Sequence, residues 1–124
     1  MFNVRPQWSA DGRLLAFQSD REGGVQQIFV VAADGSGSPR RTVTSSTGLS
    51  LTTWSASGVF GGVTRGDIWT AREGEAARPF FSSPEFELYP TFSPDGKWIA
   101  YSAVKNNRSE VFVRPYPGPE PAVR

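Results

Sequence analysis

Four acidic side chains are the candidates for chemistry in this sequence: Asp11 and Asp95 as acids that transfer a proton, and Glu85 and Glu87 as carboxylates that could flank a cation. Asp11 and Asp95 each stand before a glycine in matching stretches, and Glu85 and Glu87 lie two residues apart. The 124 residues include no histidine and no cysteine, which excludes histidine-based triads and thiolate or histidine zinc sites within this chain. Aspartate before a turn glycine usually serves backbone geometry, and carboxylates in loops usually face solvent. We therefore expect no catalytic residue, no metal site and no cofactor.

The two aspartates belong to a phrase that is repeated along the chain. "RPQWSADGRLLAFQSD" at 5–20 matches "YPTFSPDGKWIAYSA" at 89–103, and "TTWSASG" is a weaker copy between them. Their closing glycines, Gly12, Gly58 and Gly96, are spaced by 46 and 38 residues. Each copy predicts a tight turn between a short aromatic strand and a longer apolar one. The residues expected to shape these turns are Ser9, Asp11, Gly12, Ser55, Gly58, Ser93, Pro94, Asp95 and Gly96.

The runs after the turns, such as "RLLAFQS" and "KWIAYSA", are apolar at nearly every position. This pattern predicts strands buried on both faces. No helical period of adequate length is present, so further sheets have to cover these faces, as blades packed around an axis do. We therefore predict an all-β fold of about three four-stranded antiparallel β-propeller blades in a partial ring. The blades are expected at about 5–45, 50–82 and 86–124, with first-blade strands near 7–8, 13–19, 26–33 and 40–44.

The second and third copies are expected to depart from the first. Eleven residues separate Gly58 from Trp69, where seventeen separate Gly12 from Phe29, so the second blade should be shortened around a stubby, glycine-kinked strand. The third copy stops where its fourth strand would begin. An arc of three blades leaves the outer faces and strand edges of its end blades open. We expect these to meet the remaining blades of a longer protein or further copies of the chain.

Aromatic and basic side chains are the candidates for binding. Trp8, Trp54 and Trp69 recur at equivalent strand positions, which favours core packing between blades over ligand stacking. Trp98 fits this pattern least and remains a candidate for partner binding. The other candidates are arginines in loops, where propellers recognise partners: Arg65, Arg72, Arg78 and Arg108. They are compatible with either a protein or a small ligand.

Charge and hydropathy exclude two classes of partner. Thirteen basic and twelve acidic residues leave a formal net charge of +1 without any block of like charge, so we expect no nucleic-acid partner. No apolar run approaches the roughly 18 residues that a membrane span needs, so we expect no membrane insertion by this segment. The start, "MFNVRPQW", lacks the apolar region of a signal peptide, so the residues themselves give no prediction of cellular location.

The repeats resemble the WD-repeat-like β-propeller repeats of the TolB type, also called PD40 repeats. There a short aromatic strand, Ser-Pro-Asp-Gly, "KWIAYS" and "EVFV" follow one another, and the resemblance covers residues 6–119. Its strongest part, 78–118, is most similar to the propeller appended to bacterial Ser/Thr protein kinases beyond their membrane span. The resemblance implies an extracytoplasmic or periplasmic setting.

Three functions follow from the resemblance. The first is a non-catalytic binding or scaffold module from the sensor region of a bacterial receptor-type kinase. The second is the substrate-gating propeller of a prolyl-oligopeptidase-like serine peptidase, and the third is a TolB-like periplasmic interaction protein. The chain contains neither the kinase motifs nor a Gly-x-Ser-x-Gly elbow. We therefore expect no enzyme activity from it, and any kinase or peptidase activity is expected in a parent chain outside these residues.

Overall fold

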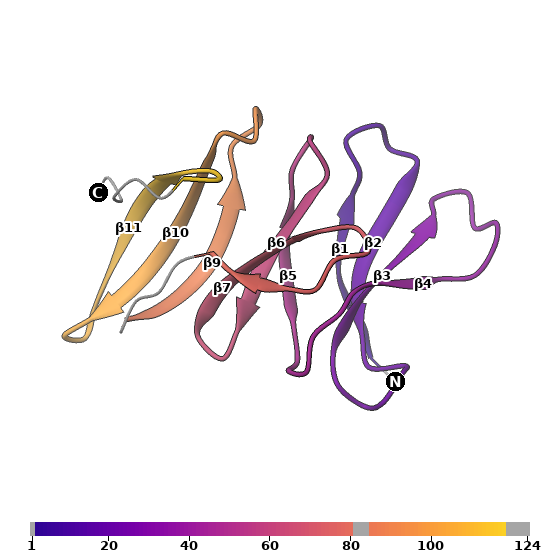
Figure 1. Ribbon diagram of the computed structural model, residues 1–124, viewed down its shortest axis with the longest axis horizontal. Helices are drawn as coiled ribbons and strands as arrows, with labels where there is room; N and C mark the ends of the chain where they lie inside the picture. Colours follow the sequence, from indigo (N-terminus) through magenta and orange to yellow (C-terminus); the bar gives the residue numbers. More distant parts are fainter. Residues whose placement is uncertain (1, 81–84, 119–124) are drawn as a thin grey trace.

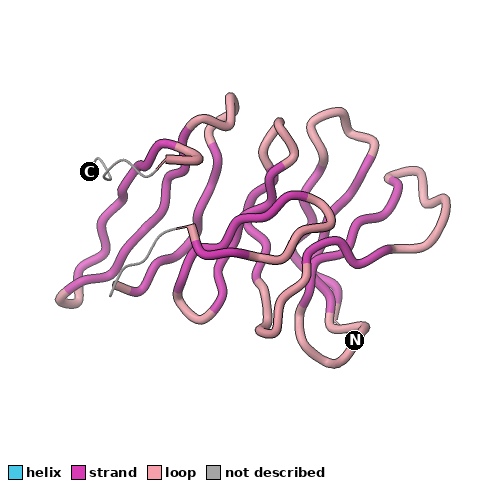
Figure 2. Tube along the Cα trace, in the orientation of Figure 1, coloured by secondary structure: helices cyan, strands magenta, loops and turns pink. Residues whose placement is uncertain are grey.

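The computed structural model describes residues 2–80 and 85–118 and arranges them in three antiparallel sheets (Figure 1). Figure 2 shows only strands and loops in these two ranges, and nothing in them forms a helix with the length and hydrophobicity of a membrane span. The strands are β1 (Asn3–Trp8), β2 (Leu14–Ser19), β3 (Gln27–Ala32), β4 (Arg40–Val43), β5 (Ser50–Trp54), β6 (Val59–Thr64), β7 (Asp67–Arg72), β8 (Arg78–Pro79), β9 (Phe86–Phe92), β10 (Trp98–Lys105) and β11 (Arg108–Pro115).

The sheets stand side by side in chain order, from β1–β4 on the right of Figure 1 to β9–β11 on the left. Their first strands are neighbours, because β1 contacts β5 and β5 contacts β9. Each sheet therefore packs a face against the next, as propeller blades do, and the prediction of an all-β fold of about three antiparallel blades is confirmed. The third sheet has three strands among the described residues, and the fourth strand predicted after it falls largely at 119–124, outside them.

One register relates the three blades. In each, the aromatic residue at the end of the first strand lies opposite an apolar residue of the second strand. The facing pairs are Trp8–Leu15, Trp54–Phe60 and Phe92–Ile99. In the second blade, the two members of the pair are one residue closer in sequence than in the other blades. The turn there is shorter, because the Ser55 N–H donates to the carbonyl of Val59, whereas the Ser9 N–H donates to that of Leu14. Aligning the copies on their glycines alone would therefore place every side chain of β6 on the wrong face.

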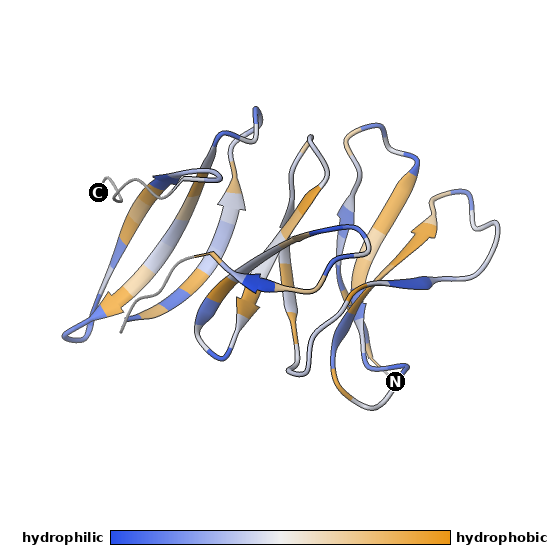
Figure 3. Cartoon of the chain, viewed as in Figure 1, coloured by the Kyte–Doolittle hydropathy of each residue, from blue (hydrophilic) through white to orange (hydrophobic). Residues whose placement is uncertain are grey.

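Each blade has a leading face, toward the preceding blade, and a trailing face, toward the following one. The first apolar core joins the trailing face of blade 1 (Ala16, Ile28, Val30) to the leading face of blade 2 (Phe60, Trp69, Ala71). The second joins the trailing face of blade 2 (Val59, Ile68) to the leading face of blade 3 (Phe92, Ile99, Tyr101). Figure 3 shows the corresponding hydrophobic stretches along the strands and hydrophilic residues at many of the loops. Because both junctions use the same pair of faces, the blades are related by a repeated rotation.

The middle blade fills its leading face in a different way from its neighbours. Where the other blades stack two aromatic rings across the second and third strands, it places Gly62 opposite Trp69. A Cβ on Gly62 would lie 1.6 Å from the carbonyl oxygen of Ser50, which accepts a hydrogen bond from Trp69 Nε1 at 3.1 Å. The stacked pairs of the other blades are Phe17–Phe29, with ring centroids 6.1 Å apart, and Tyr101–Phe112, at 5.8 Å.

The structure corrects two expectations about the strands. The strand predicted to be stubby, β6, has six residues, as many as β2. The second blade is shorter because the connection between β6 and β7 consists only of Arg65 and Gly66. The prediction that the strands are buried on both faces is wrong for β10, where burial alternates along the strand. Its trailing face has no further blade among the described residues to cover it.

The expectation of core packing is also wrong for Trp8. Trp69 is 1% exposed and Trp54 stacks on Phe60 with ring centroids 4.6 Å apart, whereas Trp8 is 63% exposed. The three blades place Trp8, Trp54 and Phe92 equivalently, so the difference comes from the neighbour and not from the position. The described residues supply a preceding blade for the second and third blades, but none for the first.

Candidate functional site

The turn aspartates bind backbone amides of their own turns. In the third blade, Asp95 Oδ1 accepts hydrogen bonds from the Ser93 hydroxyl at 2.6 Å and the Lys97 N–H at 3.0 Å. The Ser93 hydroxyl oxygen accepts in turn from the Trp98 N–H at 3.1 Å. The closing Gly96 has φ of +73°, a left-handed conformation that favours glycine. This carboxylate is therefore occupied by the turn that contains it.

The first blade repeats the same network. Asp11 Oδ1 accepts from the Ser9 hydroxyl at 2.7 Å and the Arg13 N–H at 3.0 Å. The Arg13 amide and then the Ser9 hydroxyl lower the pKa of Asp11 below its ordinary value. The Ser93 hydroxyl and the Lys97 amide do the same to the pKa of Asp95. Both carboxyl groups are thus held ionised, which suits a hydrogen-bond acceptor and not a proton donor.

We expect the melting temperature to fall as the pH drops through the lowered pKa values of Asp11 and Asp95. A carboxylate whose pKa is lower in the folded chain contributes stability above its unfolded-state pKa of about 3.9 and loses it as the pH falls through the folded-state pKa. Thermal melts followed by circular dichroism from about pH 5 to about pH 2 measure this slope. The double variant Asp11→Asn/Asp95→Asn should show a shallower slope, and equal slopes would contradict the assignment.

Glu85 and Glu87 lie in different surroundings and do not form a shared site. Glu87 is fully buried, and its Oε1 accepts a hydrogen bond from the Ile68 N–H at 3.3 Å, which ties β9 to β7. Glu85 lies near the surface, 3.9 Å from the Lys105 ammonium. No cluster of three or more potential metal-ligating acidic, histidine or cysteine side chains occurs within residues 2–80 and 85–118.

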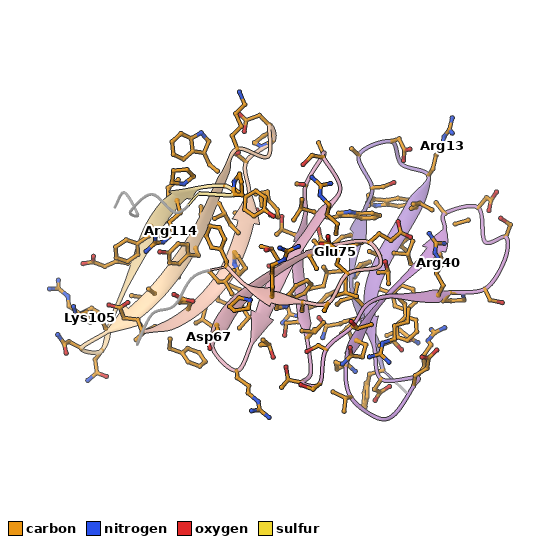
Figure 4. The ribbon with its side chains drawn as sticks, in the orientation of Figure 1. Arg13, Arg40, Asp67, Glu75, Lys105 and Arg114 are labelled. Carbon is orange, nitrogen blue, oxygen red and sulfur yellow. The ribbon has the colours of Figure 1, made fainter. Side chains whose placement is uncertain are left out.

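The four candidate arginines are divided between the two ends of the blades. Arg72 donates to the carbonyl of Ser57 at 2.8 Å, and Arg78 lies 3.2 Å from the carboxylate of Glu75, so both support the local structure of blade 2. Arg65 lies in the connection between β6 and β7, and Arg108 is the first residue of β11; both side chains are exposed at the other end of the blades. Figure 4 shows these ends: Arg13 lies at one, and Lys105 and Asp67 at the other.

A surface hollow of about 440 Å³ lies beside Arg108 at the end of the third blade. Lys105 and Arg108 line it with two carboxylates, Glu85 and Glu110, and the ring of Phe112 forms an apolar wall. Trp98 is 44% exposed but follows the Ser93 turn at the opposite end of the blade, so the structure does not bring it to Arg108. The mixed charges of this hollow favour no particular class of ligand.

A second groove, of about 370 Å³, runs across the first strands of all three blades. In a propeller these strands line the central channel. The groove collects hydrogen-bonding side chains from β1, β5 and β9, together with the Tyr89 ring, which is 66% exposed. Its lining residues are Arg5, Gln7, Leu51, Thr52, Tyr89, Pro90 and Thr91.

Arg5 and Tyr89 have an unusual backbone conformation at equivalent places in this groove. Their φ angles are 57° and 54°, each lies at an irregularity in its strand, and each precedes a proline. The left-handed conformation costs a residue other than glycine about 1–2 kcal/mol. Strained backbone conformations of this kind are found most often at ligand-binding and active sites. One indication of this backbone conformation is present in the sequence, because Pro6 aligns with Pro90. That alignment alone did not identify the residue before each proline as unusual.

A comparison with curated sequences finds similarity to a peptidase. No family model matches the chain. A curated relative described as the uncharacterized peptidase YuxL of Bacillus subtilis is 30% identical over 141 aligned residues. The alignment takes in 79% of this chain and 21% of the relative, so the chain spans about a fifth of that protein.

Solved structures share the fold of the whole chain. A protein of Agrobacterium tumefaciens assigned as TolB matches all of it with a TM-score of 0.78 and 22% identity, and TolB of Acinetobacter baumannii matches 95% of it with 0.74 and 23%. A prolyl endopeptidase matches 98% with a TM-score of 0.62 and 20% identity. The chain covers 47%, 30% and 20% of these three proteins. The fold is thus that of TolB-type β-propeller blades, and the chain corresponds to part of such a propeller.

Proposed function

We propose that this chain is a non-catalytic β-propeller segment that binds an extended polypeptide in the groove along β1, β5 and β9. One observation carries the proposal: Arg5 and Tyr89, at equivalent positions two blades apart, hold a strained backbone and line the same groove. A guanidinium donates to peptide carbonyls or a carboxylate, and an exposed tyrosine offers an amphipathic surface for side chains. Propeller channels and loops commonly serve protein recognition, which agrees with this role.

The test uses pools of fluorescein-labelled hexapeptides and fluorescence anisotropy. Tyr89→Asn and Arg5→Asn remove the side chains but keep a residue that tolerates a left-handed backbone. At least one pool should bind the wild-type chain, and each variant should weaken that binding about tenfold, which corresponds to about 1.4 kcal/mol. Arg13→Asn, at the far end of the first blade, is the control and should bind as the wild type does. The proposal is wrong if no pool binds, or if all four chains bind equally.

The finer assignment as the sensor propeller of a receptor-type kinase rests on the resemblance of residues 78–118. In that setting the groove or end loops would receive an extracytoplasmic ligand and report it to a kinase domain upstream. The substrate-gating alternative draws support from the similarity to a peptidase of Bacillus subtilis and to a prolyl endopeptidase. The TolB-like alternative draws support from the TolB structures.

The sequence that flanks this segment in its gene separates the three settings. A kinase domain and a membrane span upstream fit the first, a hydrolase domain with a Gly-x-Ser-x-Gly elbow downstream fits the second, and a signal peptide with a small α/β domain upstream fits the third. Under all three, the purified chain should show no turnover of peptide anilides or ATP. Activity that co-purifies with the chain and persists in a clean preparation would overturn the non-catalytic assignment.

A further inference from the structure

The groove along β1, β5 and β9 carries a charge that its own strands do not balance. Among these three strands, Arg5 is the only basic residue and Glu87 is the only acidic one. Glu87 is fully buried and accepts a hydrogen bond from the Ile68 N–H, whereas Arg5 is exposed and lines the groove. The other lining residues are formally neutral. The groove therefore presents a single positive charge to a ligand.

Arg5 also differs from the arginines that support the fold. Arg40 and Arg78 pair with carboxylates of the chain. Arg21 donates a hydrogen bond to the side chain of Asn3 at 2.9 Å. In the part of the chain that the structure describes, the Arg5 guanidinium makes no ion pair and no hydrogen bond. Its N–H donors are thus left to solvent or to a ligand.

The backbone that carries Arg5 is bulged, and the same irregularity carries Tyr89. Arg5 and Pro6 together lie opposite the single residue Phe17 of β2. Tyr89 and Pro90 form the same two-against-one arrangement in β9. Bulges redirect side chains and are common next to active sites. Because the left-handed backbone at both places is unfavourable for arginine and tyrosine, the fold holds these two side chains in the groove against their local preference.

We propose that the ligand of this groove carries a carboxylate, which the Arg5 guanidinium binds bidentately. This inference rests on the proposed peptide groove and names the chemical group that the groove selects. A planar guanidinium matches the geometry of a carboxylate, and such charge-assisted bonds are stronger than bonds to neutral peptide carbonyls. The polar side chains Gln7, Thr52 and Thr91 that also line the groove are uncharged, so none of them repels an anion. The carboxylate can be the C-terminus of a peptide or an aspartate or glutamate side chain.

Three sets of hexapeptides that carry an uncharged dye at the amino end test this inference. All are built from uncharged residues: the first set ends in a free carboxylate, the second in an amide, and the third in an amide with one internal aspartate. By fluorescence anisotropy, the wild-type chain should bind the first or the third set about tenfold more tightly than the second. The set that gains affinity identifies the source of the carboxylate. Salt raised from about 0.1 M to about 1 M should reduce this advantage, because the Debye length falls from about 10 Å to about 3 Å.

Three variants assign the preference to the Arg5 side chain. Arg5→Asn should bind all three sets within about twofold of one another, because asparagine tolerates the left-handed backbone but carries no charge. Arg5→Lys keeps a point charge without the planar fork and should keep part of the preference for a carboxylate. Arg13→Asn removes the same charge at the far end of the first blade and should keep the wild-type preference. All four chains should have the same circular dichroism spectrum.

The outcomes separate this inference from the function on which it rests. Equal binding of the three sets by the wild-type chain would overturn the carboxylate and leave the peptide groove intact. A preference that persists in Arg5→Asn would also overturn it, because the carboxylate would then be bound elsewhere. Binding of none of the sets would refute the peptide groove itself, and the carboxylate with it.

Discussion

Replacement of Trp69 by alanine is expected to lower the free energy of unfolding by about 3–5 kcal/mol, the usual cost of removing a buried large aromatic side chain. Trp69 is 1% exposed in the core between blades 1 and 2, and its indole N–H bonds to the Ser50 carbonyl. The variant loses the packing and leaves that partly buried carbonyl without the indole donor. Since small domains are stable by only about 5–15 kcal/mol, this loss is a large part of the total.

Urea denaturation followed by far-ultraviolet circular dichroism measures this effect. Trp8→Ala is the matched control, because Trp8 is the same residue type on the open leading face and is 63% exposed. At protein concentrations low enough to keep the chain monomeric, Trp8→Ala should change the free energy of unfolding by less than about 1 kcal/mol. Similar losses in the two variants would show that the first blade is covered within the single chain and would contradict the packing described above.

Gly62→Ala is expected to destabilise the chain by at least about 3 kcal/mol, at or above the upper range for added atoms in a packed core. The new Cβ would lie 1.6 Å from the carbonyl oxygen of Ser50 and 2.7 Å from its carbonyl carbon. These are backbone atoms, so no side-chain rotation relieves the overlap, and β5 would have to move away from β6. The hydrogen bond from Trp69 to the same oxygen would be lost with it.

Gly48→Ala provides the control for this substitution. The nearest atom to a Cβ at Gly48 is a methyl carbon of Val25 at 3.4 Å, so a small side-chain shift accommodates it. We expect a change within about 0.5 kcal/mol, as for substitutions that create neither a clash nor a cavity. Thermal melts of the two variants beside the wild type decide the question. If Gly62→Ala melts like Gly48→Ala, the close approach of Ser50 is not a constraint on this position.

The sequence predicted the parts of the fold that depend on local chemistry. The Ser-x-x-Gly phrase places turns and strands because its hydroxyl, carboxylate and glycine act within a few residues of one another. It did not predict the one-residue offset of β6, since that depends on which amide closes the turn at Ser55. Because side chains alternate between the two faces of a strand, an offset of one residue exchanges the buried face with the opposite one.

Burial of the tryptophans and the position of the groove could not be predicted in the same way. The environment of Trp8 is decided by whether a blade lies in front of it, which is a property of the assembly and not of the strand. The groove gathers Arg5, Thr52 and Tyr89 from three sheets, although Arg5 and Tyr89 are far apart in the chain. Only the stacking of the blades, which sequence spacing does not measure, brings them together.

The exchange of two rings for Gly62 and Trp69 in the middle blade has a consequence for recognising such repeats. Blades 1 and 3 fill this place with two rings, whereas the middle blade fills it with one indole and with the Ser50 carbonyl, which lies against Gly62. Position-by-position scoring penalises both members of the exchange, so a worn repeat looks more divergent than its packing is. Scoring the two cross-strand partners jointly would detect such units, because a glycine opposite a tryptophan is then treated as one exchange, and the two sites are expected to change together during evolution.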